Sequence, residues 1–140
     1  MTRIRKTASA AWRGTASAGE GILDLGEVSL PFSLRSRVSE GPSTNPEELL
    51  GAALAGCFAM SLANLCEERS TPAERIDARA TVHLVGTEEG FRIPTIELSC
   101  VARVPGVAAE VVRELAEQAE RSCPVRLLYT AEVKLSVVVE

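Results

Sequence analysis

One stretch decides the fold, residues 44–69, which reads TNPEELLGAALAGCFAMSLANLCEER. It begins with a capping residue and a proline, followed by two acids near the positive end of the helix dipole. From Leu49 to Ala63 almost every side chain is apolar or small, and this pattern predicts a long helix buried on nearly every side. A row of mostly small side chains, which lets another helix or strand approach closely, is formed by Ala52, Gly56 and Ala59 or Met60.

Glycines interrupt the chain before this helix, so we expect short strands and turns there. The candidate strands are residues 8–13, 21–24 and 28–38. The third candidate shows period-two alternation of apolar residues at Leu30 and Phe32, which continues to Leu34.

Two alternating runs follow the long helix and predict half-buried strands joined near residues 88–90. Their apolar positions are Ala78, Ala80, Val82 and Leu84, then Ile96, Leu98, Cys100, Ala102 and Val104. A second, amphipathic helix is expected from Val107 to Cys123, because a residue before proline is disfavoured in helical geometry. Alternation from Val133 to Val139 predicts a last strand. The order of elements predicts one α+β domain, residues 1–140, with mainly antiparallel pairing.

Composition and charge exclude several classes of function. The chain has 140 residues, 46% of them apolar, which suits one domain with a hydrophobic core. Its net charge of −4 comes with no cluster of Lys or Arg, so we expect no nucleic-acid partner. There is no signal-peptide core and no uninterrupted run of about eighteen apolar residues. We therefore expect a cytoplasmic protein without a membrane partner.

Histidine-based and metal-based chemistry lack the necessary residues. The only histidine, His83, lies on the polar side of an alternating strand, a pattern typical of a surface residue. The cysteines Cys57, Cys66, Cys100 and Cys123 are 9, 34 and 23 residues apart. No close pair of ligands results, so we expect neither a metal nor a cofactor.

The four cysteines differ in position, and in a reducing cytosol they either react or simply pack. Cys100 lies on the apolar side of its strand, which predicts an inert, packed thiol. Cys66 points to the opposite side of a straight helix from Cys57. The helix position of Cys57 leaves both a structural and a reactive role open. Cys123 ends the second helix, where backbone can move, and meets Cys57 only if the two helices pack together.

The cysteine motifs and the helix start resemble the OsmC/Ohr family of thiol-dependent hydroperoxide reductases. The resemblance rests on TNPEELLGAA at residues 44–53, AGCF at 55–58 and SCPV at 122–125, and covers essentially the whole chain. It implies an intertwined OsmC-like homodimer, with antiparallel sheets wrapped around two central helices that carry the reactive cysteines. The spacing of Arg37 before NPEEL favours the OsmC branch. Leu54, where some relatives have histidine, and Arg126, where serine is usual, depart from the pattern and bear on substrate preference.

The resemblance also implies roles for four residues. Cys57 is expected to be the peroxidatic cysteine and Cys123 the resolving one, with Arg37, on a strand before the helix, and Glu47 completing the site. A buried thiol needs a positive charge beside it to ionise; Arg37 supplies that charge, and Glu47 holds the guanidinium through a bidentate pair. The alternative for Glu47 is a first-turn acid favoured by the helix dipole alone.

Helix geometry bears on where such a site can lie. Ten residues separate Glu47 from Cys57 by about 15 Å, too far for one compact site, so we expect the other subunit to supply Arg37 and Glu47 at the dimer interface. Cys57 would attack an organic hydroperoxide, Cys123 would trap the sulfenic acid as a disulfide, and an external dithiol would reduce it. The alternative is a non-enzymatic OsmC-like dimer that binds a hydrophobic small molecule and has structural thiols.

Overall fold

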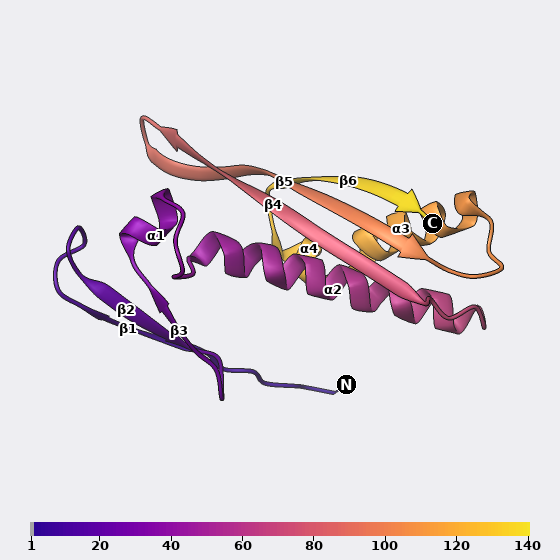
Figure 1. Cartoon of the computed structure of the whole chain (residues 1–140), viewed down its shortest axis with the longest axis horizontal. Helices are drawn as coiled ribbons and strands as arrows, with labels where there is room; N and C mark the ends of the chain where they lie inside the picture. The colour runs from indigo at the N-terminus through magenta and orange to yellow at the C-terminus, as the bar shows by residue number, and fades with distance from the viewer. Residues whose placement is uncertain (1) are drawn as a thin grey trace. The chain divides into compact units, whose positions relative to one another are not determined.

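The computed structural model describes residues 2–140, which form two three-stranded sheets and four helices (Figure 1). The chain clusters into two compact units, divided between Leu49 and Leu50. Helix α2, Pro46–Glu68, crosses this division as one unbroken helix, as the sequence predicts. The single domain expected from chain length stays a prediction.

The N-terminal unit contains an antiparallel sheet in the order β1-β2-β3. The strands are β1 (Ser9–Arg13), β2 (Glu20–Asp24) and β3 (Ser29–Phe32). Trp12 of β1 and Phe32 of β3 meet across β2, with ring centroids 5.5 Å apart. Between them, Gly21 leaves the space that the Phe32 ring occupies, because an added Cβ would lie only 2.4 Å from that ring.

The strand predicted for residues 28–38 is wrong in its second half. β3 ends at Phe32, and a short helix, α1 (Leu34–Val38), follows it. Ser33 caps this helix: the backbone N–H of Ser36 donates to Ser33 Oγ at 3.1 Å, and the N–H of Ser33 donates to Ser36 Oγ at 3.0 Å. This reciprocal capping box overrides the apolar alternation that continues to Leu34. Arg37 therefore lies in a helix, not on a strand.

The C-terminal unit is built on a sheet in the order β4-β5-β6. β4 (Arg75–Thr87) and β5 (Gly90–Arg103) form the predicted antiparallel hairpin, whereas β6 (Glu132–Val139) pairs with β5 in parallel. Two helices lie between β5 and β6 along the chain, α3 (Ala109–Ser122) and α4 (Pro124–Leu128). A helical crossover of this kind returns the chain to the same end of the sheet, so β6 runs parallel. This sheet is mixed, although antiparallel pairing predominates overall.

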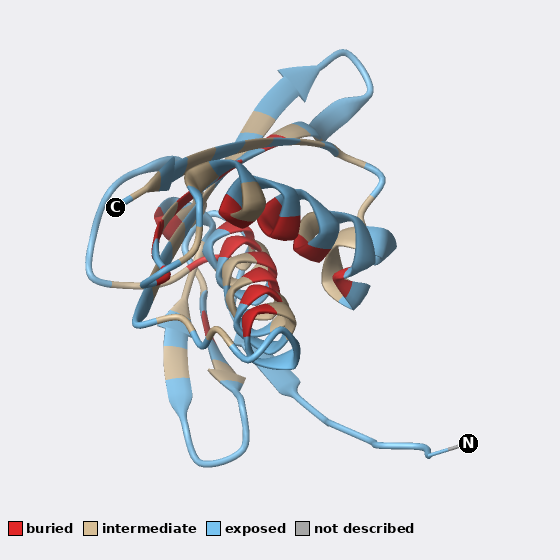
Figure 2. Cartoon of the chain, turned by 90° about the vertical axis from the view of Figure 1, so that its right-hand side faces the viewer, coloured by how far each residue is buried: buried red, intermediate tan, exposed pale blue. Residues whose placement is uncertain are grey.

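Helix α2 is buried on one side only, so the prediction of burial on nearly every side is wrong for the single chain. A row at helical spacing, Leu54, Phe58, Leu62 and Cys66, is fully buried against β5 and α3. Figure 2 shows the buried residues of α2 on the side that faces α3. On the other side Met60 is 70% exposed, because α3 and the sheet cover a single face of α2 within this unit.

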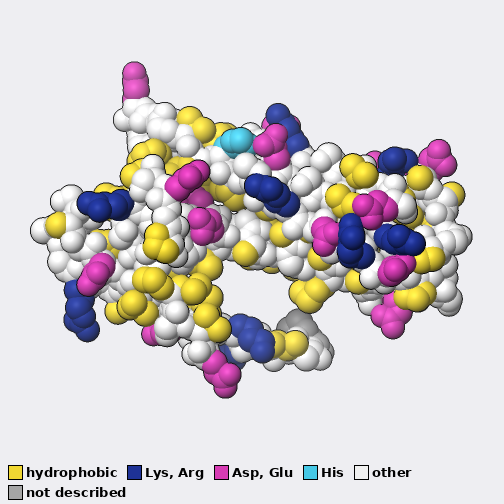
Figure 3. All heavy atoms as spheres, viewed as in Figure 1, with side chains coloured by type: hydrophobic (Ala, Val, Ile, Leu, Met, Phe, Trp, Pro, Cys, Tyr) yellow, Lys and Arg dark blue, Asp and Glu magenta, His cyan; other side chains and the backbone are white. Residues whose placement is uncertain are grey.

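Length and composition alone would allow α2 to cross a membrane. The core helix of a soluble protein meets the same criteria, and one row of α2 side chains is buried in the hydrophobic core. On the face shown in Figure 3, acidic and basic side chains are interspersed across the C-terminal unit and form no basic patch.

Candidate functional site

An arginine–glutamate pair forms the first group of predicted site residues, in the N-terminal unit. The side chain of Asn45 caps α2 by accepting a hydrogen bond from the N–H of Glu48 at 2.9 Å. Its amide also donates to the carbonyl oxygen of Ser36 at 3.0 Å. These two bonds fasten α1 to the first turn of α2, and they bring Arg37 beside Glu47.

Arg37 binds Glu47 through a single carboxylate oxygen. Its Nε donates to Oε1 at 2.9 Å, and its Nη2 lies 2.7 Å from the same atom. The predicted bidentate pair is thus made by two nitrogens and one oxygen. The other oxygen, Oε2, is buried without a hydrogen-bond partner among residues 2–140. The side chain of Glu47 is 10% exposed and that of Arg37 33%, so the guanidinium stays accessible while its carboxylate is buried.

An apolar cavity adjoins this arginine within the same unit. Its volume is about 240 Å³, and aromatic and aliphatic side chains make up most of its wall. It is lined by Trp12, Ala16, Phe32, Ser33, Leu34, Arg37 and Pro46. The cavity therefore combines an apolar wall with one positive charge. This arrangement suits a small ligand with an apolar tail and an oxygen-rich end.

A pair of thiols forms the second group of predicted site residues, in the C-terminal unit. Cys57 is half-buried on α2, Cys123 is fully buried at the junction of α3 and α4, and both are free thiols. Burial raises the pKa of the Cys123 thiol above its ordinary value, and a side-chain hydrogen bond with Cys57 raises it further. The two thiols are therefore neighbours, although 66 residues separate them in the sequence.

The chain bends at Cys123, between α3 and α4. Cys123 has φ −63° and ψ 119°, so it is extended, and its N–H donates to the carbonyl of Ala119 at 3.0 Å as α3 ends. Pro124 opens α4 in the position where proline is favoured. The backbone N–H groups of Arg126 and Val125 donate to the Cys123 sulfur and lower its pKa, against the larger effect of burial. Sequence reasoning gives the end of α3 but misses α4, which is only five residues long.

Tyr129 is a site neighbour that sequence reasoning misses. Its hydroxyl donates to the carbonyl of Leu50 in α2 at 2.9 Å. Burial raises the pKa of the Tyr129 phenol, and the negative charges of the Cys123 and Cys57 thiolates raise it further, so Tyr129 lies near both sulfurs. Tyr129 is the only tyrosine in the chain, and that is the one signal that could have singled it out.

The two remaining cysteines pack in the core. Cys66 and Cys100 are fully buried, and burial raises the pKa of both thiols. The pKa of Cys100 rises to about 11, because the charges of Asp77 and Cys66 add to the effect of burial. At neutral pH such a thiol is almost entirely protonated and unreactive.

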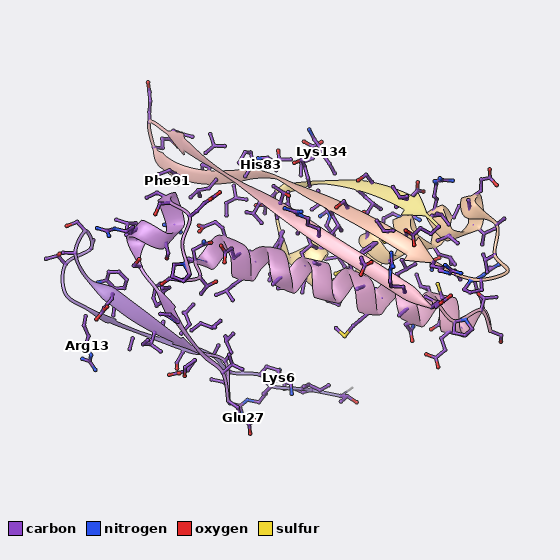
Figure 4. The ribbon with its side chains drawn as sticks, in the orientation of Figure 1. Lys6, Arg13, Glu27, His83, Phe91 and Lys134 are labelled. Carbon is purple, nitrogen blue, oxygen red and sulfur yellow. The ribbon has the colours of Figure 1, made fainter. Side chains whose placement is uncertain are left out.

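His83 lies on the surface, as its place in the sequence pattern predicts. It projects from β4 on the side of the sheet away from α2 (Figure 4), and its side chain is 45% exposed. Its Nε2 lies 2.8 Å from a carboxylate oxygen of Glu97 on the neighbouring strand. No group of three or more possible metal ligands occurs within residues 2–140.

The four predicted site residues thus form two pairs, Arg37 with Glu47 and Cys57 with Cys123. Each pair lies within a different compact unit. Because α2 is continuous, Glu47 and Cys57 are ten residues apart along one helix, or about 15 Å.

Comparison with known proteins shows what the chain resembles. A family model described as OsmC-like protein matches residues 39–138. Peroxiredoxin OsmC of Escherichia coli (strain K12) is 34% identical over 135 residues, which are 94% of each chain. Among solved structures, an OsmC-like protein of unknown function from Vibrio cholerae has a TM-score of 0.81 at 14% identity, covering 97% of this chain and 100% of the other. The organic hydroperoxide resistance protein OhrB of Bacillus subtilis has a TM-score of 0.66 at 24% identity, covering 96% and 98%.

Proposed function

The chain belongs to the OsmC-like family and is a cysteine-based peroxidase, and from that premise we propose that it reduces organic hydroperoxides with Cys57 and Cys123. The observation that carries this proposal is the pairing of two free thiols that are distant in sequence. A non-enzymatic, ligand-binding dimer does not require Cys57 and Cys123 to be neighbours.

The chemistry takes place in two steps at these sulfurs. The Cys57 thiolate attacks the outer oxygen of the hydroperoxide; the O–O bond breaks, the alkoxide leaves and is protonated to the alcohol, and Cys57 becomes a sulfenic acid. The Cys123 thiolate then attacks the Cys57 sulfur; the S–O bond breaks, hydroxide leaves and is protonated to water, and a disulfide forms. An external dithiol reduces the disulfide by thiol exchange.

Arg37 and Glu47 complete the site from a second subunit. The guanidinium favours the Cys57 thiolate and binds the peroxide oxygens, and Glu47 fixes its position. The distance of about 15 Å along α2 prevents Glu47 from serving Cys57 of its own chain. We therefore propose a homodimer in which Arg37 and Glu47 of one subunit act on the thiols of the other.

The outer face of α2 suits this dimer. Ala52, Gly56 and Met60 form an exposed row at helical spacing, and a Cβ added at Gly56 would meet no atom within 4 Å. Small side chains on an apolar helix face let a second helix approach closely. A second subunit on this face would bury the apolar surface that the single chain leaves in water.

The apolar cavity beside Arg37 supports an organic hydroperoxide as the substrate. Its aromatic wall can bind an alkyl or aryl tail while the guanidinium binds the peroxide oxygens, whereas hydrogen peroxide has no tail to bind. We expect kcat/KM for an alkyl hydroperoxide to exceed that for hydrogen peroxide by tenfold or more, since burying about two methylene groups contributes about 1.6 kcal/mol. Equal kcat/KM values for the two substrates would show that this cavity does not bind the hydroperoxide tail.

The four free thiols fit a reducing compartment, and we propose that the protein acts in the cytoplasm as part of the response to oxidative stress.

Cysteine replacements followed by mass spectrometry test the proposed function. The wild-type protein treated with one equivalent of an alkyl hydroperoxide should lose two hydrogens and show a crosslink between Cys57 and Cys123. Cys57→Ser should abolish turnover. Cys123→Ser should allow the first attack, after which Cys57 accumulates sulfinic acid. Cys66→Ala is the matched control, because it removes a buried thiol outside the pair, and it should retain turnover. Four unchanged thiols in the wild type, or full activity in Cys57→Ser, would end the proposal.

A further inference from the structure

The bend that carries Cys123 is fastened on both sides, and Tyr129 is one of the contacts on its downstream side. Upstream, α3 buries one face in the core through Val112, Leu115, Ala116 and Ala119. Downstream, no residue of α4 is fully buried, and Leu127 and Leu128 are 67% and 78% exposed. Val125 of α4 and then Tyr129 pack, partly buried, against the core, and Arg126 forms an ion pair with Glu120 of α3. Of these residues, Tyr129 also forms a hydrogen bond to α2, at the carbonyl oxygen of Leu50.

The contact made by Tyr129 matches the position of the thiol pair on α2. Leu50 and Cys57 are seven residues apart, almost two full turns, so they lie on the same side of α2 about 10 Å from each other. From Cys123 to Tyr129 the chain advances six residues, about 9 Å if helical. Segment 123–129 therefore contacts α2 twice at matching spacing, at Cys57 through a thiol and at Leu50 through the Tyr129 hydroxyl.

We infer from this geometry that Tyr129 is a positioning residue, which holds the segment with Cys123 against α2 so that Cys123 reaches the Cys57 sulfur before a second oxidant does. The inference rests on the proposed pairing of Cys57 with Cys123. A Cys57 sulfenic acid has two fates, attack by Cys123 or further oxidation to sulfinic acid. Holding one reactant in place raises its effective concentration, so the Tyr129–Leu50 hydrogen bond favours disulfide formation.

The pKa of Tyr129 also indicates that its phenol lies close to Cys57 and Cys123. The charges of both thiolates raise the pKa of the phenol, after the larger effect of burial. A disulfide carries no charge, so oxidising the pair should lower the pKa of Tyr129. Because Tyr129 is the only tyrosine, the ultraviolet absorbance of tyrosinate reports on this residue alone.

The test separates resolution from attack without using a peroxide. The reduced protein is mixed with one equivalent of an aromatic disulfide that releases a coloured thiolate. Attack by Cys57 releases the first thiolate in a bimolecular step, and attack by Cys123 on the mixed disulfide releases the second in a unimolecular step. Cys123→Ser should show the first release only, and Cys57→Ser neither, which assigns the two steps.

Tyr129→Phe removes the hydroxyl and keeps the ring. We expect the first release to stay within about twofold of wild type and the second to slow by roughly threefold to tenfold, the effect of one lost hydrogen bond. Ser122→Ala is the matched control: Ser122 is exposed, and the change removes a hydroxyl that donates to the carbonyl of Gln118 at 2.9 Å within α3. It should leave both steps unchanged.

Two results would overturn the inference: a second release in Tyr129→Phe at the wild-type rate, or a tyrosine titration midpoint that is the same in the reduced and disulfide forms. The proposed function fails separately. If the wild type does not react with hydroperoxide but its second release still depends on Tyr129, the peroxidase mechanism is wrong and the positioning role stands. If hydroperoxide turnover needs both cysteines but Tyr129→Phe resolves normally, the mechanism stands and the positioning role is wrong.

Discussion

Glu47 and Glu48 are adjacent acids in the first turn of α2. Replacing each in turn shows whether Glu47 acts by binding Arg37 or only through the helix dipole. Both gain from the helix dipole, which contributes about 0.3–1 kcal/mol to each. Only Glu47 binds Arg37, whereas Glu48 is exposed and accepts a hydrogen bond from Thr44 Oγ1 at 3.1 Å. Glu47→Gln and Glu48→Gln should therefore cost similar dipole energy and differ by the arginine contact.

The size of that difference follows from the geometry. Glu47 Oε1 receives Nε at 2.9 Å and Nη2 at 2.7 Å, and hydrogen bonds to a charged group contribute about 1.5–3 kcal/mol. Arg37 is one third exposed, and glutamine can still accept one hydrogen bond, so we expect a net loss of about 1–2 kcal/mol. If this contact holds the guanidinium where it binds the peroxide, its loss should lower kcat/KM for an alkyl hydroperoxide by about fivefold to thirtyfold.

The assay is kcat/KM with an alkyl hydroperoxide, together with urea denaturation of both variants. We expect Glu47→Gln to lose activity well beyond twofold and Glu48→Gln to remain within about twofold of wild type. Equal activity losses in the two variants, at equal stability, would refute the reasoning, because the dipole alone would then account for Glu47.

Three further predictions concern the interface, the core and the cavity. Gly56→Leu fits the single chain, where a Cβ meets no atom within 4 Å, so it should fold normally yet shift the proposed dimer to monomer and abolish turnover; an active dimer by light scattering would contradict the proposed interface. The pKa of Cys100 is raised from 9.0 to about 11 in the folded state, so its contribution to stability is complete below pH 9 and about 2–3 kcal/mol is lost as the pH rises to 11. Urea denaturation of Cys100→Ala should show a shallower alkaline decline, and an unchanged decline would count against this account. Trp12→Ala removes part of the cavity wall, so it should lower kcat/KM for a bulky hydroperoxide several-fold and leave that for hydrogen peroxide unchanged; an equal loss with both substrates would show that Trp12 supports the fold instead.

Much of the fold could be predicted from the sequence, because most elements follow local rules. The start of α2 obeys the capping preferences of Asn45 and Pro46, and the end of α3 follows from Pro124. Residues 33–38 could not be predicted, since apolar alternation and a serine capping box give opposite signals there. The parallel pairing of β6 also depends on the path of the crossover and not on any local pattern.

The candidate site was harder to predict because its parts meet through tertiary packing. Cys57 and Cys123 are distinguishable from Cys66 and Cys100 by position, yet their proximity depends on how α2, α3 and α4 pack. Tyr129 has no motif around it, and its contact with Leu50 spans 79 residues. Sequence spacing therefore identifies candidate reactive groups more readily than the residues that hold them in place.

Helix α2 fixes the distance between Glu47 and Cys57 within one chain. Its first turn contains Glu47, which binds Arg37, and its fourth turn contains Cys57, so Glu47 and Cys57 of one chain stay apart along an unbroken helix. No movement of α1 shortens this distance while Arg37 stays bound to Glu47, because Glu47 is itself a residue of α2. A compact site thus requires either a break in α2 or a second subunit. A break would expose backbone groups of a helix that buries Leu54, Phe58 and Leu62, whereas a second subunit would cover the exposed face around Gly56. This comparison supports the proposed dimer, and if the dimer is needed for turnover, specific activity should fall with dilution as it dissociates.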